Sequence, residues 1–374
     1  MQLYVHIPFC KSKCLYCDFR SFPCSEQKDI SVYLNGLNRE IALAGREFGG
    51  RQITSVYIGG GTPSLLSVEQ FGSLFQTLKS SFDIPSTAEF TVECNPESIT
   101  AEKLAFLRGQ GVNRLSIGLQ SLFDDNLRAI GRIHSRQVAL EKLSIATKFF
   151  DNVSVDFIVG LPHDTTERVR EQINHVAPFV NHVSVYMLQV EEGTPLKKLV
   201  EEGKISIPDE DTQVDLFSEA CRALNDYGFE RYEVSNFSKK LCHSQHNVGY
   251  WTREEYLGLG LNASGLIFDT KTGTQKRIKN TENLEKYLLD ARNSASYFDF
   301  DRDEVVLSND EILEEKIMLG LRISDGVDKS ILGEERVKML TSKFKDYVVV
   351  KSDKIALTGE GMDVMNSILV ELLA

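Results

Sequence analysis

Three cysteines near the start of the chain have types and spacing that could bind a metal centre. Cys10, Cys14 and Cys17 fall in "YVHIPFCKSKCLYCDFR" (residues 4–20), in a C-x3-C-x2-C pattern. A structural zinc site usually has four closed ligands in two spaced pairs, and no second pair is visible here. Cys24 could be a fourth ligand, but no zinc-knuckle pattern surrounds it. Three thiolates suit a 4Fe-4S cluster that leaves one iron open to an exogenous ligand; zinc or unligated thiols are the alternatives.

Composition limits the environment in which these thiols work. The 374 residues carry a formal net charge of -12, which makes nucleic acid an unlikely partner. No run of about 18 apolar residues occurs, and the N-terminus has no basic and apolar secretory pattern. We therefore expect a cytoplasmic protein, in which the seven cysteines stay reduced.

Strands and helices alternate along the first two thirds of the chain. Short apolar, β-branched runs predict strands at 3–7, 55–60, 89–94, 114–120, 153–160 and 183–188. Helices are predicted at 28–48 and 209–227, with N-caps at Ser67, Thr100, Ser135 and Thr166 for others. Six strand–helix repeats indicate parallel strands with crossover helices, in either a doubly wound sheet or a barrel. The near-continuous apolar character of the strands is typical of a covered sheet.

The conspicuous residues follow the carboxyl ends of these predicted strands. The cysteines follow the first strand and Gly59-Gly60-Gly61-Thr62 the second, Glu93 ends the third, and Gln120 ends the fourth. The glycines lack the Lys-Ser/Thr ending of a phosphate loop, so close backbone approach to another ligand, or a plain turn, explains them. Function gathers at this end of the strands in both candidate folds, which predicts one shared site.

The pattern changes after residue 235, which suggests three parts. Residues 1–235 hold the strand–helix repeats, and residues 236–307 look like an irregular connecting segment containing "HNVGYW". Residues 308–374 predict helices at 309–321 and 334–344, a hairpin at 347–357 and a last helix opened by Thr358. This order suggests a winged-helix-like unit, and the acidic balance argues against DNA binding.

The sequence resembles the radical S-adenosylmethionine (radical SAM) superfamily. In that superfamily the open iron binds S-adenosylmethionine, and reductive cleavage of S-adenosylmethionine gives a 5′-deoxyadenosyl radical. "YIGGGTPS", "TVECNPES", "RLSIGLQS", "VDFIVGLP", "EEGTPL", "YEVSNFS" and "HNVGYW" extend the cysteine motif along almost the whole chain. Together they resemble the oxygen-independent coproporphyrinogen III oxidase family, most closely its HemW-type haem chaperone branch. The implied fold is α/β, a partial (β/α)6 TIM-like barrel with a small C-terminal α+β winged-helix-like domain.

The resemblance also implies site residues and cofactors: a 4Fe-4S cluster, S-adenosylmethionine and haem. Cys10, Cys14 and Cys17 would hold the cluster. Tyr16 would lie near the adenine or only shield the cluster. Positions implied to contact S-adenosylmethionine are Tyr4, Tyr16, Gly60, Gly61, Thr62, Glu93, Gln120, Arg132, Asp156 and Met187. The haem candidates are His246, Asn247, Tyr250 and Trp251, with packing as the alternative for Trp251 and with His243 as a rival ligand.

Two functions are compatible with this resemblance: a chaperone that delivers haem to apo-proteins, with acceptors at the membrane as one option, and an oxidase that decarboxylates coproporphyrinogen III. The oxidase has a further cysteine two positions after the third ligand, where this chain has Phe19, and an N-terminal extension that we do not expect here. Both departures favour the chaperone, which leaves enzymatic activity uncertain. Ser264 stands where HemW relatives usually have a histidine, so another radical reaction on a tetrapyrrole stays open. The resemblance also implies an electron donor such as flavodoxin or ferredoxin, and the protein could form a homodimer.

Overall fold

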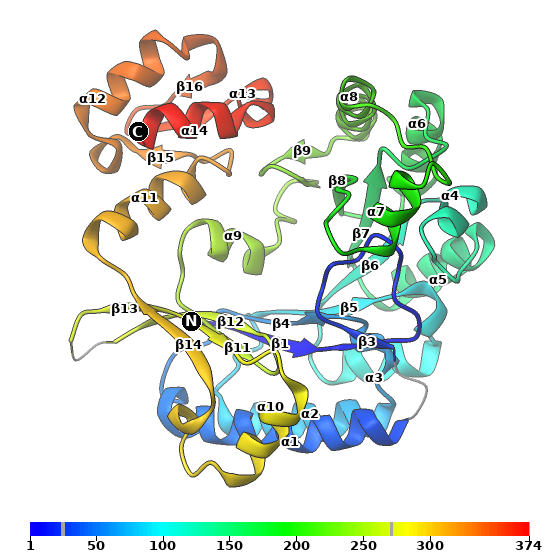
Figure 1. Cartoon of the computed structure of the whole chain (residues 1–374), viewed down its shortest axis with the longest axis vertical. Coiled ribbons are helices and arrows are strands. Elements are labelled where there is room, and N and C mark those ends of the chain that lie inside the picture. Colours follow the sequence, from blue (N-terminus) through cyan, green and yellow to red (C-terminus); the bar gives the residue numbers. More distant parts are fainter. Residues whose placement is uncertain (24–26, 270–271, 374) are drawn as a thin grey trace.

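A twelve-stranded sheet forms the body of the molecule in the computed structural model, which describes residues 1–23, 27–269 and 272–373 (Figure 1). Its strand order is β14-β13-β12-β11-β1-β4-β5-β6-β7-β8-β10-β9. The six predicted strands lie side by side in the middle, each parallel to the next, and this prediction is confirmed. They are β1 (Gln2–Ile7), β4 (Ser55–Gly60), β5 (Glu89–Cys94), β6 (Arg114–Gln120), β7 (Asn152–Val159) and β8 (His182–Met187).

Helices connect these strands and cover the outer face of the sheet. The predicted caps Ser67, Thr100 and Ser135 each accept a backbone N–H from the residue three positions on. The predicted cap Thr166 is wrong by one residue, because the side chain of Thr165 accepts the N–H of Arg168. The helices are α1 (Gln27–Phe48), α2 (Val68–Ser81), α3 (Ala101–Gly109), α4 (Asp124–Ala129), α5 (Arg136–Phe149), α6 (Thr166–Val176), α7 (Pro195–Glu201) and α8 (Glu210–Asp226).

The central strands alternate between apolar and polar side chains rather than being apolar throughout, which corrects the sequence-based expectation. One face of each strand belongs to the main hydrophobic core beneath the helices: Val56, Ile58, Val92, Leu115, Ile117, Val155, Val183 and Val185. Alternate residues lie on the opposite face of a strand. That inner face carries the polar side chains Tyr57, Glu93, Arg114, Ser116, Asp156 and Ser184, all of which line one cavity. Barrel interiors are usually filled by branched apolar residues, so a polar interior indicates a binding site.

Residues 236–307 were expected to be irregular, but they extend the sheet on both edges. β10 (Asn236–Ser238) pairs antiparallel with β8 and with β9 (Glu230–Arg231). β11 (Tyr256–Leu259) joins β1 in parallel, and an antiparallel meander follows it. The remaining elements are α9 (Gln245–Trp251), β12 (Ser264–Phe268), β13 (Gln275–Asn280), α10 (Leu284–Asn293) and β14 (Arg302–Val306). Short strands among many glycines and asparagines gave too weak a periodic signal to be recognised.

The C-terminal unit has a hydrophobic core of its own and lies beyond the sheet in Figure 1. α11 (Asn309–Gly320) begins at the predicted capping box, in which Ser308 and Glu311 cap each other. α12 (Lys329–Ser342) starts earlier than predicted and is interrupted at Gly333 (φ 77°). The expected hairpin is present, and Thr358 caps the helix that follows it. The other elements are β15 (Val327–Asp328), β16 (Val348–Val350), β17 (Lys354–Leu357), α13 (Gly359–Asp363) and α14 (Met365–Leu373).

A cluster of charges joins this unit to the sheet. The carboxylate of Glu315, on α11, accepts from Nε of Arg253 at 2.7 Å and from Nη2 of Arg277 at 2.8 Å. Arg253 follows α9 and Arg277 belongs to β13, so one carboxylate connects three parts of the chain. Within the described residues, no helix is long and apolar enough to cross a membrane.

Candidate functional site

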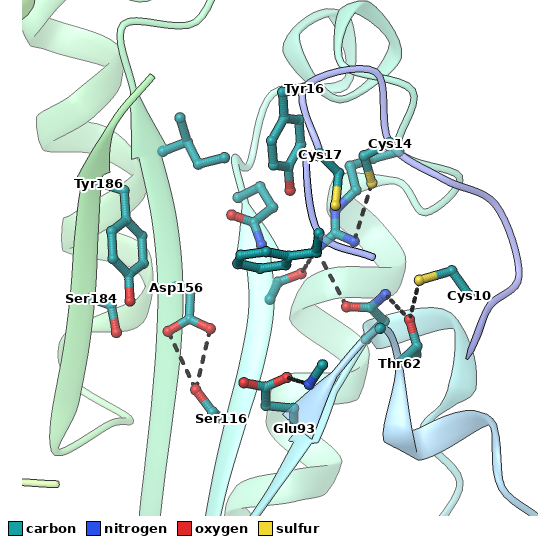
Figure 2. Close-up of a pocket in the computed structure, with 18 of the residues that line it drawn as sticks. Cys10, Cys14, Tyr16, Cys17, Thr62, Glu93, Ser116, Asp156, Ser184 and Tyr186 are labelled. Carbon is teal, nitrogen blue, oxygen red and sulfur yellow. Dashed lines mark hydrogen bonds between the residues drawn. The ribbon is translucent and has the colours of Figure 1, made fainter. Parts of the chain in front are cut away.

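The cysteine loop lies over the carboxyl ends of the central strands, where it borders a cavity of about 440 Å³ (Figure 2). Backbone bonds hold the loop at both sides, since Leu15 N donates to Ile130 O at 3.0 Å and Leu15 O accepts from Leu196 N at 2.9 Å. Cys10, Cys14 and Cys17 are free, half-buried thiols that all line the cavity. The volume is within the range of about 300–1,000 Å³ that is typical of small-molecule sites.

The thiols and their surroundings fit a cluster better than a single metal ion. Thr62 Oγ1 donates to the sulfur of Cys10 at 3.6 Å, and Arg132 Nη1 donates to that of Cys14 at 3.7 Å. Positive charge and hydrogen bonds near the sulfurs stabilise the thiolates that ligate iron. Among the described residues, no three Cys, His, Asp or Glu side chains converge on one ion. The cysteines of a 4Fe-4S cluster bind different irons and need not converge, while Cys24 lies outside the described residues.

Gly60 and Gly61, at the end of β4, form a shelf beside the cysteine loop. Neither position has room for a larger residue. Gly60 has φ +114°, and a Cβ there would lie 2.6 Å from the ring of His6. A Cβ on Gly61 would lie 2.7 Å from the carbonyl oxygen of Phe9, the residue next to Cys10. Thr62 N donates to that same oxygen at 2.7 Å. The shelf therefore fixes the backbone beside the cysteine loop and leaves open space above it.

Two carboxylates on the inner face of the sheet are partly protected from solvent. Glu93 accepts from Tyr57 Oη at 2.8 Å and from Gly60 N at 3.0 Å. Burial raises the pKa of Glu93 to about 7, helped by the nearby negative charge of Asp156. Burial also raises the pKa of Asp156, which accepts from Ser116 Oγ at 3.2 Å. Both groups can therefore accept hydrogen bonds from a ligand's ammonium or hydroxyl groups, and both gain protons more readily than usual.

The other predicted cavity residues come from three further segments. Arg132, which follows α4, donates from Nη2 to the carbonyl of Gly118 at 2.6 Å, while its Nε has no partner. Gln120 has φ 64° at a bulge that ends β6. Tyr16 and Met187 line the same space, and Met187 is 39% exposed at the end of β8. The structure thus brings predicted residues from the five strands β4 to β8, the segment after α4 and the cysteine loop into one cavity.

Tyr4 is the predicted cofactor residue that does not line this cavity. Its hydroxyl lies 2.9 Å from Nδ1 of His6, and its ring stacks on Tyr57 with centroids 6.2 Å apart. Tyr4 therefore contacts the glycine shelf through His6 rather than facing the open space.

The haem candidates form helix α9, and only Asn247 lines the main cavity. His246 is fully buried: Nδ1 lies 2.8 Å from Ser55 Oγ, and Nε2 lies 2.8 Å from Tyr250 Oη. Burial lowers the pKa of His246 to about 3. The guanidinium of Arg322 lies 5.2 Å above the ring of Trp251, so this ring packs toward the C-terminal unit. The rival His243 stacks on Tyr232 at 4.1 Å.

Sequence reasoning missed several polar residues of the cavity. They include Tyr57, Arg114, Ser116, Ser184 and Tyr186. Figure 2 shows that Ser116, Asp156, Ser184 and Tyr186 gather on the side of the pocket away from the three cysteines. A period-two alternation of polar residues in the predicted strands was the signal that could have identified them.

Comparison with known proteins places the chain in a family. The model of the Radical SAM superfamily matches residues 4–176. A protein of Bacillus subtilis (strain 168) named "Heme chaperone HemW" is 35% identical, with 94% of this chain and 91% of the relative aligned. A protein of Lactococcus lactis subsp. lactis with the same name is 31% identical over 99% of this chain and 96% of the relative. The solved structure of coproporphyrinogen III oxidase (HemN) from Escherichia coli is similar in fold, with a TM-score of 0.83 and 24% identity over 99% of this chain and 89% of that one.

The fold and the cysteine loop define a radical SAM protein, with the mixed α/β architecture that the sequence predicted. Within that superfamily, the chain belongs to the HemW family.

Proposed function

We propose that this protein is a haem chaperone that binds haem and delivers it to apo-proteins in the cytoplasm. The observation that carries the proposal is the near full-length match to relatives named as haem chaperones. Phe19 adds support, because it stands at the position of the oxidase's extra cysteine and offers no thiol. The residue is 64% exposed and lines the cavity. Acceptors at the membrane, a flavodoxin or ferredoxin as electron donor, and a homodimer are part of the same proposal.

For the cofactors we propose that Cys10, Cys14 and Cys17 hold a 4Fe-4S cluster, which supplies an open iron and one electron. S-adenosylmethionine would then lie between the cluster and the inner face of the sheet. Its methionine part would rest on Gly60, Gly61 and Thr62, and the carboxylate of Glu93 would accept hydrogen bonds from it. Arg132 would position the carboxylate, and Gln120, Asp156, Tyr16 and Met187 would surround the remainder. Tyr4 would act from behind the shelf, by holding His6.

For haem we propose the segment that includes α9, where Asn247 faces the cavity. His246 can bind iron only if its bond to Ser55 or its bond to Tyr250 breaks, because both ring nitrogens are occupied. Each such hydrogen bond contributes about 0.5–1.5 kcal/mol, so the binding free energy of a strong ligand can offset the opening of α9. His243 needs no such movement, since its ring stacks on Tyr232 and is half-buried.

The proposal is tested against the oxidase by supplying coproporphyrinogen III to the anaerobically reconstituted protein, with S-adenosylmethionine and a reductant. We expect no decarboxylated product in chromatography of the oxidised porphyrins. Repeated turnover to protoporphyrinogen would reject the chaperone assignment. A protein known to have oxidase activity provides the positive control for the assay conditions.

A further inference from the structure

Arg114, on the inner face of the sheet, forms no ion pair with any residue that the structure describes. Arg114 begins β6 and is 2% exposed, yet it lines the main cavity. Its Nε donates no hydrogen bond, and no carboxylate oxygen of the described residues lies within 4.0 Å of its guanidinium. Burying an unpaired charge is costly, which makes such a group exceptional in a folded protein.

Another buried arginine of the chain shows what a structural role requires. Arg302 has a side chain that is 2% exposed, and its Nη2 donates to the buried Glu40 at 3.1 Å. Nε of Arg302 donates to Asn280 Oδ1 at 2.6 Å. Arg302 therefore has the partners that Arg114 lacks, although the guanidinium of each is removed from solvent.

The carboxylates nearest to Arg114 use their oxygens elsewhere. Glu89 accepts the backbone N–H groups of Gln245 and His246 at 2.9 and 3.0 Å, where it caps the start of α9. Asp156 accepts from Ser116. Their charges raise the pKa of Arg114 and keep it cationic, but they leave its N–H groups without acceptors. The acceptors for these groups are therefore left to what occupies the cavity, either water or a ligand.

We propose that Arg114 binds the carboxylate of an organic anion that occupies the inner part of the cavity. A planar guanidinium with free donors matches a carboxylate, which it can bind through two parallel hydrogen bonds. Tyr57, Ser116, Ser184 and Asn247 line the same cavity and offer hydroxyl and amide groups to the rest of the molecule. Ser116 and Ser184 lie on the side of the cavity away from the three cysteines, as Figure 2 shows. This anion site depends on the main cavity and is independent of where haem binds.

The test compares Arg114→Met with Arg302→Met in the full-length reconstituted protein. Without ligand, we expect Arg302→Met to lower the thermal midpoint clearly, because it leaves Glu40 buried without its cation. We expect Arg114→Met to lower it much less, because no hydrogen bond is lost. An Arg114→Met variant as unstable as Arg302→Met would show a structural role and overturn the proposal.

Binding is then measured by calorimetric titration with propionate and succinate as carboxylate probes and propionamide as the uncharged control. We expect Arg114→Met to weaken carboxylate binding about tenfold or more. Arg114→Lys should weaken it less, because lysine keeps the positive charge but cannot form the two parallel hydrogen bonds of a guanidinium. Equal affinities in the wild type and both variants would refute the proposal.

The source of the carboxylate is distinguished by repeating the titration with S-adenosylmethionine present. Persistent, Arg114-dependent binding of propionate would identify a separate organic acid. Loss of propionate binding, together with weaker binding of S-adenosylmethionine by Arg114→Met, would show that Arg114 belongs to the S-adenosylmethionine site and would contradict a separate anion. Binding of propionamide as tight as that of propionate would also contradict the proposal.

Discussion

At the scale of single residues, the three cysteines of the loop differ from the other thiols in their surroundings. Cys94 is buried, burial raises its pKa to about 12, and its sulfur contacts the carbonyl of Val92. Such a thiol stays protonated and inert. Cys10 and Cys14 instead meet a hydroxyl and a guanidinium beside an open cavity. Cys94 lines the same cavity but is only 3% exposed, so solvent exposure distinguishes the loop cysteines from it.

We predict that replacing Cys10, Cys14 or Cys17 by Ala abolishes the broad visible absorption of the reconstituted protein. Each loss leaves a cluster with two thiolates, which is too few to hold four irons. Iron and sulfide analysis after anaerobic reconstitution is the measurement. Cys94→Ala, Cys221→Ala and Cys242→Ala are matched controls that should keep about four irons per chain. Full iron content in a triple Ala variant would contradict the prediction.

The site residues that belong to a sequence motif were predictable. The site residues that belong only to the alternating pattern of a strand were not predicted. The cysteines, the glycine shelf, Glu93 and Gln120 all line the cavity, as their positions at strand ends indicated, and Asp156 joins them as the resemblance implied. Arg114 and Ser116 stand further back along β6, where their types alone suggested no role. His246 looked available for iron, but its ring is buried against Ser55, a contact between residues 191 positions apart. Sequence patterns cannot reveal such long-range partners.

At the scale of elements, α9 closes the amino-terminal side of the sheet interior. Glu89 at the start of β5 accepts the free N–H groups at the amino end of α9, and His246 joins it to β4. Gly249 packs against the side chain of Gln2, where a Cβ would lie 2.0 Å from the amide nitrogen. The helix is thus held by polar contacts, which a change in protonation can break.

We predict that acid opens α9 through His246. Its pKa of about 3 in the closed state lies below the usual 6.5, so below pH 6.5 the open state binds a proton that the closed state does not. Stability of the closed helix is therefore complete above pH 6.5 and falls as pH decreases toward 3. Trp251, the only tryptophan, ends α9, and its fluorescence should report the opening.

The control for this titration is His246→Gln, which removes the titrating group and keeps a polar side chain. Its fluorescence transition should move to lower pH than that of the wild type. Burial also lowers the pKa of His182, so some acid sensitivity should remain in both proteins. Superimposable titration curves would show that His246 does not control the helix.

At the scale of the whole molecule, two hydrophobic cores meet across charged contacts. The main core includes the central strands and their helices, and the second core belongs to the C-terminal unit. Glu315 links them through Arg253 and Arg277, and Arg231 of β9 pairs with Asp363 of α13 at 2.8 Å. The six-strand body and the helix–helix–hairpin order were both recognisable from local periodicity. The strands of the sheet extension were not, because their pairing depends on distant partners such as β1.

We predict that Glu315→Gln lowers the free energy of unfolding of the C-terminal unit by about 1–3 kcal/mol, because it leaves the nearly buried Arg253 without its anion. Urea unfolding followed by limited proteolysis of the unit measures the change. Glu304→Gln breaks the exposed pair with Lys276 and should change stability by less than about 1 kcal/mol. Equal effects of the two substitutions would contradict the bridging role of Glu315.

The proposed role of this radical SAM protein is to bind haem and deliver it to apo-proteins. Haem titration of the anaerobically reconstituted protein, followed by size-exclusion chromatography, tests it most directly. We predict about one retained haem per chain with the cluster intact. We also predict a changed Soret band in His246→Ala or His243→Ala, whichever residue ligates the iron, and in neither case a loss of cluster iron. A wild-type protein that retains no haem after chromatography would contradict the account.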